Sequence, residues 1–275
     1  MTTTSPQRPD LTLAERIFLR FWCRTPPPLP FEPRDAYDAK PPEMHPEPLE
    51  RTRRVYGDRF AQALVGRVFL DIGCGLGDQV IAAAETGAQL SVGLDTVEIN
   101  LRMGATQAES RGVTDRVRFA TDAIATFGTE WADVALSQNS FEHFDDPGEI
   151  LDQAYRALKP GGQFFVTFGP SWWHPFGVHH MFMIKLPWAH AVFSEQTILR
   201  VRQLYRPNLP VCWREVGLNK MTVAKLLHLV AETPFVVTDL TFTPIRPLPA
   251  WLVRLRLFRE WTTADTSVIL TKPLR

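Results

Sequence analysis

The sequence predicts an α/β fold with a doubly wound, mostly parallel β-sheet, and three observations support this prediction. The segment from Val68 to Asp78 joins an apolar run to a glycine-containing turn and a helix-compatible continuation, as expected where a buried strand leads into a helix. From residue 49 onward, helix-like and strand-like segments alternate regularly. Acidic or amide side chains end several of these strands, at the edge where such sheets bind ligands.

The turn after the first strand contains Gly73, Gly75 and Gly77 in a G-x-G-x-G spacing. Glycines accept positive φ angles and have no Cβ atom, so a ligand can approach the backbone beside a helix N-terminus. The dinucleotide-binding fingerprint has a different spacing, G-x-G-x-x-G. Because Asp71 precedes the turn and Asp78 follows it, the turn suits a cationic ligand better than a diphosphate.

The elements around this turn follow from apolar residues at helical or strand spacing. The predicted helices cover residues 49–64, 78–86, 97–111 and 147–158, and the predicted strands cover 67–72, 90–95, 117–122, 133–138 and 163–168. Right-handed crossovers bring the carboxyl ends of parallel strands to one edge of the sheet, where ligands bind. Asp71, Asp95, Asp122 and Gln138 all fall on that edge.

Asp95 ends the second predicted strand, 18 positions beyond Gly77. A carboxylate at this position can accept both hydrogen bonds of a ribose diol. It could instead cap the helix predicted at 97–111, and the two roles are compatible.

Composition excludes several classes of function. With 275 residues and 45% hydrophobic composition, the chain can bury one sizeable α/β core. Thirty basic and thirty acidic residues cancel, which argues against a sequence-independent nucleic-acid binder. Cys23, Cys74 and Cys212 are scattered without metal-ligand spacing, so we expect a reducing cytoplasm. The first eleven residues lack the apolar region of a signal peptide, and glycines, prolines and histidines interrupt the uncharged stretch at 160–184, so we expect neither a leader nor a membrane span.

The N-terminal residues 11–24 predict an amphipathic helix, with Leu13, Ile17, Phe21 and Trp22 near one face and arginines elsewhere. Such a helix could form a lid over an active site or a shallow contact with an anionic membrane. Docking on its own domain is the default interpretation, because amphipathicity first reports packing. The residues that follow, up to 48, are rich in proline and predict an extended arm.

Five motifs follow one another in the chain: D-I-G-C-G-L-G, G-L-D, T-D-A, S-Q-N-S-F-E-H-F and L-K-P-G-G. In this order and at these intervals they resemble the class I (Rossmann-like) S-adenosylmethionine-dependent methyltransferases, in their small-molecule branch. The resemblance covers residues 51–168. It implies that the helix at 222–232 and the strands at 235–242 and 266–272 are the family's last helix and closing antiparallel pair, which gives a seven-stranded sheet. G-L-N-K-M-T, just before that helix, also occurs in small-molecule members.

The resemblance also divides the chain. We expect an N-terminal helix and proline-rich arm at 1–48 and a methyltransferase domain at 49–275. Within that domain, the segment 169–219 is an insertion after the fifth strand, where loops of related enzymes cover the acceptor site. Residues 251–261, between the last two strands, mix apolar residues with arginines and could meet the N-terminal helix, a membrane or a second subunit, with packing on the domain as the default.

The cofactor implied by the resemblance is S-adenosyl-L-methionine. In that family pattern, Asp71 balances the ammonium group, Asp95 holds the ribose hydroxyls, and Asp122 with the Ala123 amide contacts the adenine. A sulfonium needs acids near the turn, so the residues and the resemblance agree. The implied cofactor-binding set is Asp71, Gly73, Gly75, Gly77, Asp95, Thr96, Asp122, Ala123, Gln138 and Asn139.

His143 is the candidate catalytic residue. Methyl transfer from a sulfonium is an in-line displacement, so the protein aligns the reactants, excludes water and sometimes removes a proton. His143 follows the fourth strand, where the resemblance places residues that face the sulfonium, and histidine is the natural base near neutral pH. It could instead orient the acceptor, or merely satisfy a backbone carbonyl. We expect the neighbouring Glu142 at the surface or as a lid contact.

The insertion supplies the candidate acceptor contacts, Trp172, Trp173, His174, His179 and His180. An aromatic, mostly uncharged wall predicts an apolar or aromatic acceptor. The tryptophans could instead pack the insertion into a small core of its own. The H-x4-H-H spacing is flexible and has no companion cysteine, so we expect no metal.

We therefore expect a methyltransferase (EC 2.1.1.-) that methylates oxygen or carbon of a small hydrophobic or aromatic molecule. A non-catalytic scaffold or partner protein is the first alternative, and an NAD(P)-dependent dehydrogenase is a lesser one. Tyr155 and Lys159 have the spacing of a short-chain reductase dyad, but Lys159 belongs to K-P-G-G. No N-P-P-Y-like tetrapeptide follows the fourth strand, which disfavours methylation of nucleic-acid bases. The oligomeric state stays open.

Overall fold

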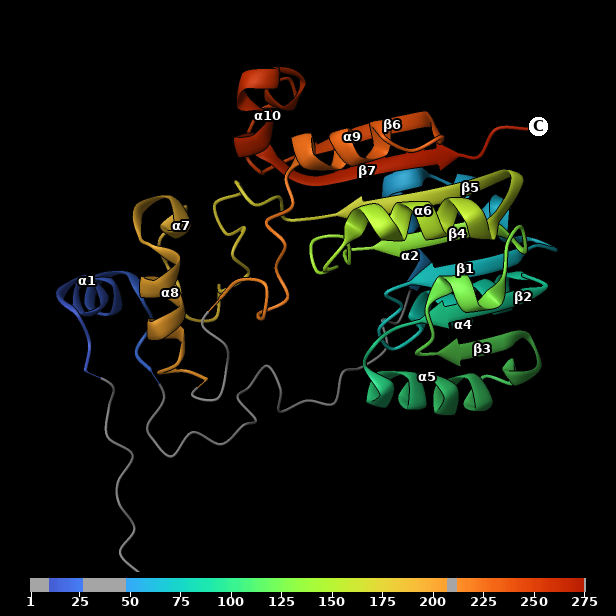
Figure 1. Cartoon of the computed structure of the whole chain (residues 1–275), viewed down its shortest axis with the longest axis horizontal. Helices are drawn as coiled ribbons and strands as arrows, with labels where there is room; N and C mark the ends of the chain where they lie inside the picture. The colour runs from blue at the N-terminus through green and yellow to red at the C-terminus, as the bar shows by residue number, and fades with distance from the viewer. Residues whose placement is uncertain (1–9, 27–47, 207–211, 275) are drawn as a thin grey trace, which may run out of the picture.

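The computed structural model describes residues 10–26, 48–206 and 212–274 (Figure 1). Most of the proline-rich arm predicted at 25–48 therefore lies outside the described residues. None of the helices in these described ranges has the length and hydrophobicity of a membrane span.

A seven-stranded sheet forms the centre of the molecule, with strand order β3-β2-β1-β4-β5-β7-β6. Its strands are β1 (Val68–Ile72), β2 (Leu90–Leu94), β3 (Val117–Ala120), β4 (Ala132–Gln138), β5 (Leu158–Phe168), β6 (Val236–Pro244) and β7 (Thr263–Thr271). The first five strands pair in parallel. β7 is antiparallel to both β5 and β6. This arrangement confirms the predicted fold class. From β1 the strand order runs one way to β2 and β3 and the other way to β4 and β5, and doubly wound folds open a crevice at such a switch point.

Helices cover both faces of the sheet. Those on one side are α2 (Pro48–Tyr56), α3 (Arg59–Leu64), α4 (Asp78–Thr86) and α5 (Glu98–Ser110), and those on the other are α6 (Pro147–Ala157) and α9 (Val223–Ala231). The last two lie in front of the sheet in Figure 1. The helix predicted at 49–64 is two helices, because Gly57 takes a φ of +63° between them.

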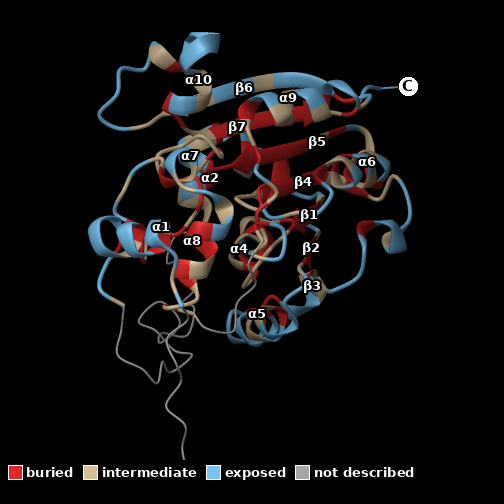
Figure 2. Cartoon of the chain, turned by 60° about the vertical axis from the view of Figure 1, so that its left-hand side comes forward, coloured by how far each residue is buried: buried red, intermediate tan, exposed pale blue. Residues whose placement is uncertain are grey.

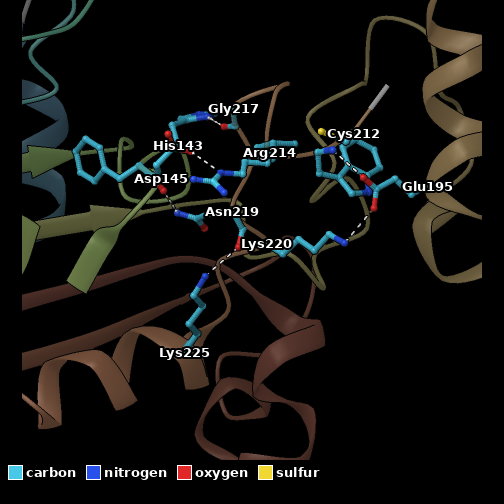
Figure 3. A pocket seen from close by; sticks show the side chains of 12 residues that line it. His143, Asp145, Glu195, Cys212, Arg214, Gly217, Asn219, Lys220 and Lys225 are labelled. Carbon is cyan, nitrogen blue, oxygen red and sulfur yellow. Dashed lines mark hydrogen bonds and ion pairs between the residues drawn. The ribbon is translucent and has the colours of Figure 1, made fainter. Parts of the chain in front are cut away.

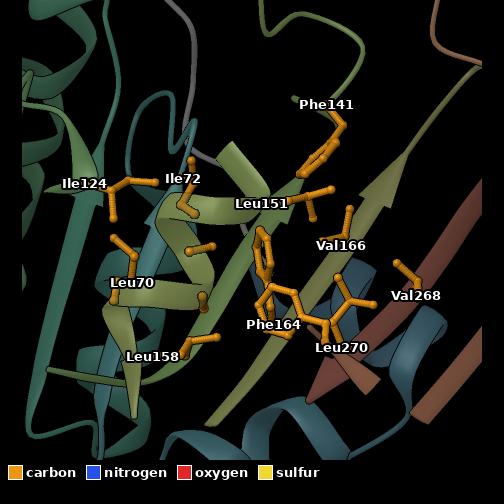
Figure 4. Close-up of a cluster of buried hydrophobic side chains, with 14 of the residues drawn as sticks. Leu70, Ile72, Ile124, Phe141, Leu151, Leu158, Phe164, Val166, Val268 and Leu270 are labelled. Carbon is orange, nitrogen blue, oxygen red and sulfur yellow. The ribbon is translucent and has the colours of Figure 1, made fainter. Parts of the chain in front are cut away.

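The core follows from the way side chains alternate between the two faces of the central strands. Along β5, Phe164 and Val166 point into the cluster beneath α6 and α9, shown in Figure 4. Phe165 points to the opposite face, where its ring centroid lies 5.2 Å from that of Phe60. Successive side chains of a strand alternate between faces, so a strand buried on both sides is apolar throughout.

β5 begins earlier than predicted and includes K-P-G-G. Lys159 lies in β5, and its Nζ is 2.9 Å from Asp133 Oδ2 across the strand pair. Tyr155 instead packs under Lys272, whose Nζ lies 4.7 Å from the ring centroid. The two residues of the dehydrogenase-like spacing therefore have separate partners.

The segment between β5 and α9 builds a second, smaller core. It contains α7 (Ala189–Val192) and α8 (Glu195–Arg202), with Ile198, Leu199 and Trp213 among its buried side chains. The N-terminal segment docks on this core. Arg24 N donates to Met183 O, and Lys185 N donates to Trp22 O, both at 2.8 Å.

The N-terminal segment forms α1 (Leu13–Ile17) and the π-helical turn η1 (Phe18–Trp22). The segment docks on its own domain, as the default interpretation has it, but not through its apolar face: Leu13 and Phe21 are 74% and 62% exposed, and Ile17 and Trp22 are exposed as well. Phe18 is buried instead, against Phe193 at 4.6 Å between ring centroids. Glu15 is also buried, because it pairs with Arg200 of α8 at 3.3 Å. Figure 2 shows the contrast between the exposed α1 and the buried side of α8.

Residues 251–261 contain a 3-10 turn, η4 (Leu252–Arg254), and part of α10 (Arg256–Thr262). Val253 is buried, whereas Trp251 and Leu257 are 58% and 80% exposed. Trp261 stacks on Trp173 of the insertion, with ring centroids 4.9 Å apart. The segment thus packs on the domain through only some of its apolar side chains.

Candidate active site

A cavity of about 420 Å³ opens at the carboxyl ends of β1, β2 and β4, around the glycine turn, and we call it the glycine-turn cavity. Of the predicted cofactor-binding residues, six line it: Asp71, Gly73, Gly75, Asp95, Gln138 and Asn139. Asp78, which the sequence analysis noted for its charge, lines it too, whereas sequence reasoning missed Gln79 and Ser140.

The three glycines of the turn all have positive φ angles and differ in what surrounds them. Gly75 has a φ of +55° and nothing within 4 Å of the position where a Cβ would be, so its backbone faces open space. A Cβ on Gly73 would lie 2.5 Å from Ser140 Oγ. A Cβ on Gly77 would lie 2.3 Å from the Phe119 ring, so Gly77 packs against β3. Only Gly75 therefore leaves bare backbone for a ligand to approach.

Asp95 ties the glycine turn to the end of β2. Its Oδ2 accepts from Gly75 N at 2.8 Å, and its Oδ1 accepts from Val97 N at 2.9 Å. The predicted capping role is modified: α5 begins at Glu98 with Val97 as its N-cap residue, and Asp95, two positions before that residue, accepts from its amide. Each carboxylate oxygen has a further lone pair, so both roles predicted for Asp95 are geometrically compatible.

Asp71 is 2% exposed, and burial, followed by the charges of Asp95 and Asp78, raises its pKa to about 8. Burial in a low-dielectric site disfavours the carboxylate, and the neighbouring acids add like-charge repulsion. A cation in the glycine-turn cavity would relieve both effects. This site is therefore electrostatically matched to a positively charged ligand.

The amide side chains after β4 have unused hydrogen-bonding groups. Gln138 Nε2 and Asn139 Oδ1 are buried without hydrogen-bond partners among the described residues. Asn139 also has a φ of +54°, which is unusual for a residue other than glycine. Buried polar groups are normally satisfied, and backbone strain tends to gather at functional sites.

Thr96, Asp122 and Ala123 are exposed and do not line the glycine-turn cavity. Asp122 and Ala123 follow β3, the next strand beyond β2 in the sheet. The predicted contacts therefore lie in a row along the sheet edge, from the end of β4 through β1 and β2 to β3. An elongated ligand could lie along this row.

His143 lies in the loop after β4, between two further cavities. Its Nδ1 is 2.6 Å from the Gly217 carbonyl oxygen (Figure 3). Because a carbonyl can only accept, Nδ1 is the donor in this contact, and in the neutral imidazole Nε2 then keeps its lone pair. His143 thus satisfies a backbone carbonyl, as one predicted alternative has it, and this leaves Nε2 able to accept a proton.

The first of these cavities, the outer cavity of about 420 Å³, is the one drawn in Figure 3. Lys220 and Lys225 line it and already have partners: Lys220 Nζ lies 3.1 Å from Glu195 Oε2, and Lys225 Nζ lies 2.9 Å from the Asn219 carbonyl oxygen. Its polar groups are therefore largely paired within the protein.

The second cavity, of about 330 Å³, is lined by His143 together with His179 and His180, and we call it the histidine cavity. The rings of His143 and His179 meet edge to face, with centroids 5.3 Å apart. Burial, with smaller contributions from neighbouring cationic groups, lowers the pKa of His179 to about 4 and that of His180 to about 3. Both are therefore neutral near pH 7 and can orient a ligand without adding charge.

The structure does not bring the other three candidate acceptor contacts to this cavity. Trp172 packs against Trp213 at 5.4 Å, which matches the small-core alternative. Trp173 stacks between Trp261 and His190, and His174 Nδ1 accepts from Phe176 N. None of the three lines the glycine-turn, outer or histidine cavity.

Glu142 is not at the surface as expected. It is 3% exposed, and burial raises its pKa to about 7. Its chain segment packs inward because Asn219 N donates to the Glu142 carbonyl and the Asn219 side chain donates to Phe141 O at 2.6 Å. Within the described ranges there is also no group of three or more His, Cys, Asp or Glu residues that could hold a metal ion.

Comparison with known proteins identifies the central part of the chain. Residues 70–166 match a family described as a methyltransferase domain. This matched region resembles a methyltransferase domain and makes up about a third of the chain. A curated relative from Pseudomonas entomophila, named ubiquinone biosynthesis O-methyltransferase, is 36% identical over 106 residues, which are 38% of this chain and 45% of the relative. The match therefore spans less than half of that relative's length.

Solved structures show the same methyltransferase fold. An S-adenosylmethionine-dependent methyltransferase from Mesorhizobium loti has a TM-score of 0.54 at 16% identity, covering 83% of this chain and 100% of its own. The [4+2]-cyclase SpnF has a TM-score of 0.52 at 17% identity, covering 80% of this chain and 82% of its own. At these identities the likeness concerns the fold alone.

Proposed function

We propose that the protein transfers the methyl group of S-adenosyl-L-methionine to a small hydrophobic or aromatic acceptor. The observation that carries this proposal is the glycine-turn cavity, where three acidic side chains and unpaired amide groups surround the bare backbone of Gly75. S-adenosyl-L-methionine has an ammonium and a sulfonium group, and it needs acids in place of phosphate-binding groups.

The residues present fit this cofactor. Asp71 would face the ammonium group, the Gly75 backbone would approach the methionine part, and Asp95 would accept from the ribose hydroxyls. Asp122, one strand further along the edge, would reach the adenine, with Thr96 and Ala123 beside it. Gln138 and Asn139 would direct their unpaired atoms toward the transferred methyl group.

Oxygen is the favoured atom for methylation, with carbon as the second candidate. The name of the curated relative, an O-methyltransferase, supports oxygen. The bound cofactor would supply an electrophilic methyl group. His143 Nε2 would take the proton of the acceptor hydroxyl as the new carbon–oxygen bond forms, while the hydrogen bond from Nδ1 to Gly217 holds the ring in place.

A non-catalytic scaffold is the alternative from another class. A cyclase shares this architecture, so the fold alone does not require methyl transfer. Calorimetric titration with S-adenosyl-L-methionine, NAD and NADP separates the alternatives. We expect low-micromolar binding of the first alone, followed by S-adenosylhomocysteine release when hydrophobic phenols are added. A folded protein that binds none of the three would favour the scaffold, and NAD binding would favour a dehydrogenase.

We also propose that the exposed apolar face of the N-terminal segment contacts an anionic membrane surface. The face consists of Leu13, Ile17, Phe21 and Trp22, and Arg16, Arg20 and Arg24 are exposed beside it. Apolar side chains flanked by arginines fit an interfacial helix on acidic lipids.

The three cysteines are free, which supports a reducing compartment such as the cytoplasm.

Vesicle co-sedimentation tests this contact. We expect the protein to pellet with phosphatidylglycerol vesicles and much less with phosphatidylcholine vesicles. The double variant Leu13→Ser/Phe21→Ser should stay in the supernatant. Val65→Ser, between α3 and β1, changes a valine that is 61% exposed and serves as the control. Equal pelleting of all variants would refute the contact.

A further inference from the structure

Arg202 is an arginine inside the small core of the insertion. It ends α8, and only 7% of it is exposed. Its Nε and Nη1 atoms are buried without hydrogen-bond partners, and no acid pairs with it among residues 10–26, 48–206 and 212–274. A buried guanidinium is normally paired, since an unpaired buried charge is costly. This side chain therefore lacks a partner that its position calls for.

The histidine cavity is where that partner would lie, because Arg202 lines it together with His143. The lining described consists of three histidines, two arginines and four apolar residues, without Asp or Glu. His179 and His180 are neutral near pH 7 for the reasons given above, so they cannot compensate the charge. Arg206, the second arginine, lies over the Phe182 ring at 4.9 Å.

The charge on Arg202 persists under ordinary conditions. Burial and the nearby Arg206 lower its pKa only to about 10. At neutral pH Arg202 therefore brings a positive charge to a cavity that His143 also lines. Guanidinium groups bind carboxylates and phosphates through paired hydrogen bonds, and these are stronger than hydrogen bonds between two neutral groups.

We propose that Arg202 binds an oxyanion group, a carboxylate or a phosphate, on the methyl acceptor. The apolar body of the acceptor would then lie against Met181, Val216 and Leu218, with its reacting atom toward His143. A volume of about 330 Å³ suits a molecule with one ring, at the lower end of small-molecule sites. The placement of the reacting atom rests on the proposed function, whereas the oxyanion site rests on Arg202 itself.

Stability distinguishes a binding role from a structural one. Arg202→Met keeps the bulk of the stem and removes an unpaired buried charge, so we expect its melting temperature to rise by about 2–4 °C. Arg200→Met is the matched control two positions earlier: Arg200 is paired with the buried Glu15, so its loss should lower the melting temperature. A large fall for Arg202→Met would mean that Arg202 has a structural role and would overturn the proposal.

Binding is tested with benzoate, phenyl phosphate and the uncharged benzamide, by calorimetry on the full chain. We expect at least one of the two anions to bind about tenfold more tightly than benzamide, the scale of a charge-assisted hydrogen bond. Whichever anion binds identifies the oxyanion. Arg202→Met should reduce its affinity to that of benzamide, and Arg202→Lys should retain part of it. Equal affinity of the wild type for anions and benzamide, or unchanged anion binding by Arg202→Met, would overturn the proposal.

The same variants separate this proposal from the proposed function. Arg202→Met should bind S-adenosyl-L-methionine as the wild type does, because Arg202 does not line the glycine-turn cavity. Anion binding that depends on Arg202, in a protein that does not bind the cofactor, would keep the oxyanion site and end the methyltransferase proposal. Methylation of neutral phenols alone, without anion preference, would do the reverse.

Discussion

The glycine-turn cavity and the histidine cavity have opposite charge. Asp71, Asp78 and Asp95 line the first, whereas Arg202 and Arg206 line the second, without a described acid. The segment from β4 to His143 contributes to both. Charge alone therefore sorts the two ligands: a cationic methyl donor is favoured on the sheet side and an anionic acceptor on the insertion side.

The two cavities also differ in construction. The first lies at the carboxyl ends of β1, β2 and β4, which are neighbours whose positions the sheet fixes. The second lies between loops and the insertion, as in the contact between His143 and Gly217, which are 74 positions apart. We expect substitutions in the first to affect the fold and the cofactor together, and substitutions in the second to affect the acceptor alone.

The largest effect should come from filling the turn where it packs. Gly77→Val places a branched side chain against the Phe119 ring at a φ of +79°, so we expect it to lower the free energy of unfolding by about 3–5 kcal/mol. Gly75→Ala meets open space and should cost about 1 kcal/mol while weakening cofactor binding. Urea denaturation measures both, and equal losses would contradict the different roles of the two glycines.

His143→Ala tests the segment shared by the two cavities. Loss of a general base should reduce turnover on a phenolic acceptor by about a hundredfold, with unchanged affinity for S-adenosyl-L-methionine. Stopped assays of S-adenosylhomocysteine release and calorimetry give the two quantities. His228→Ala, on an exposed face of α9, is the control. A parallel loss of turnover and cofactor affinity would make His143 structural.

Asp95→Ala probes the acidic cavity alone. We expect cofactor affinity to fall by at least about 1–2 kcal/mol, because the carboxylate that holds the Gly75 amide and the predicted ribose hydroxyls is lost. Benzoate binding in the histidine cavity should not change. An unaltered cofactor affinity would remove Asp95 from the ribose site, and Asp115→Ala, an exposed acid elsewhere, controls for net charge.

The smallest effect concerns pH. The pKa of Asp71 is raised to about 8 in the folded chain, so the folded state holds a proton that the unfolded chain releases at much lower pH. Its contribution to stability is therefore lost as pH rises through 8. We expect the free protein to melt at a lower temperature at pH 8.5 than at pH 7, and the cofactor to raise that temperature more at the higher pH.

Asp71→Asn isolates this contribution, because Glu142 also has a raised pKa and changes stability in the same direction. The variant should lose part of the pH dependence and much of its cofactor affinity. A full pH dependence in Asp71→Asn would assign the effect to other groups. The buried histidines titrate well below pH 7 and do not contribute in this window.

Much of the fold could be predicted from the sequence because its signals are local. The helix predicted at 78–86 has these bounds in the structure, and the five parallel strands were each located. The N-terminal helix shows the limit of this approach. Its amphipathic pattern was recognised, but the π-helical turn and the pairing of Glu15 with Arg200 decide which side is buried.

Arg202 shows the same limit at the site. The only available signal was an arginine among apolar residues at helical spacing, Ile198, Val201 and Tyr205, and no helix was predicted there. Trp172 and Trp173 were more conspicuous in the sequence, yet they pack within the protein. Residue type indicates what a side chain can do, but neighbours from other segments decide whether it faces a cavity.

Local sequence patterns are enough to predict the doubly wound sheet, the glycine turn and the acids along the sheet edge. These features depend on strand and helix periods and on short spacings in the sequence. Packing around a single sheet then fixes their positions. The tertiary structure alone decided which histidines meet His143, that Glu142 is buried, and that an unpaired arginine shares their cavity. Such features arise when long-range packing closes loops onto one another, and no local pattern encodes which side chain is left without a partner.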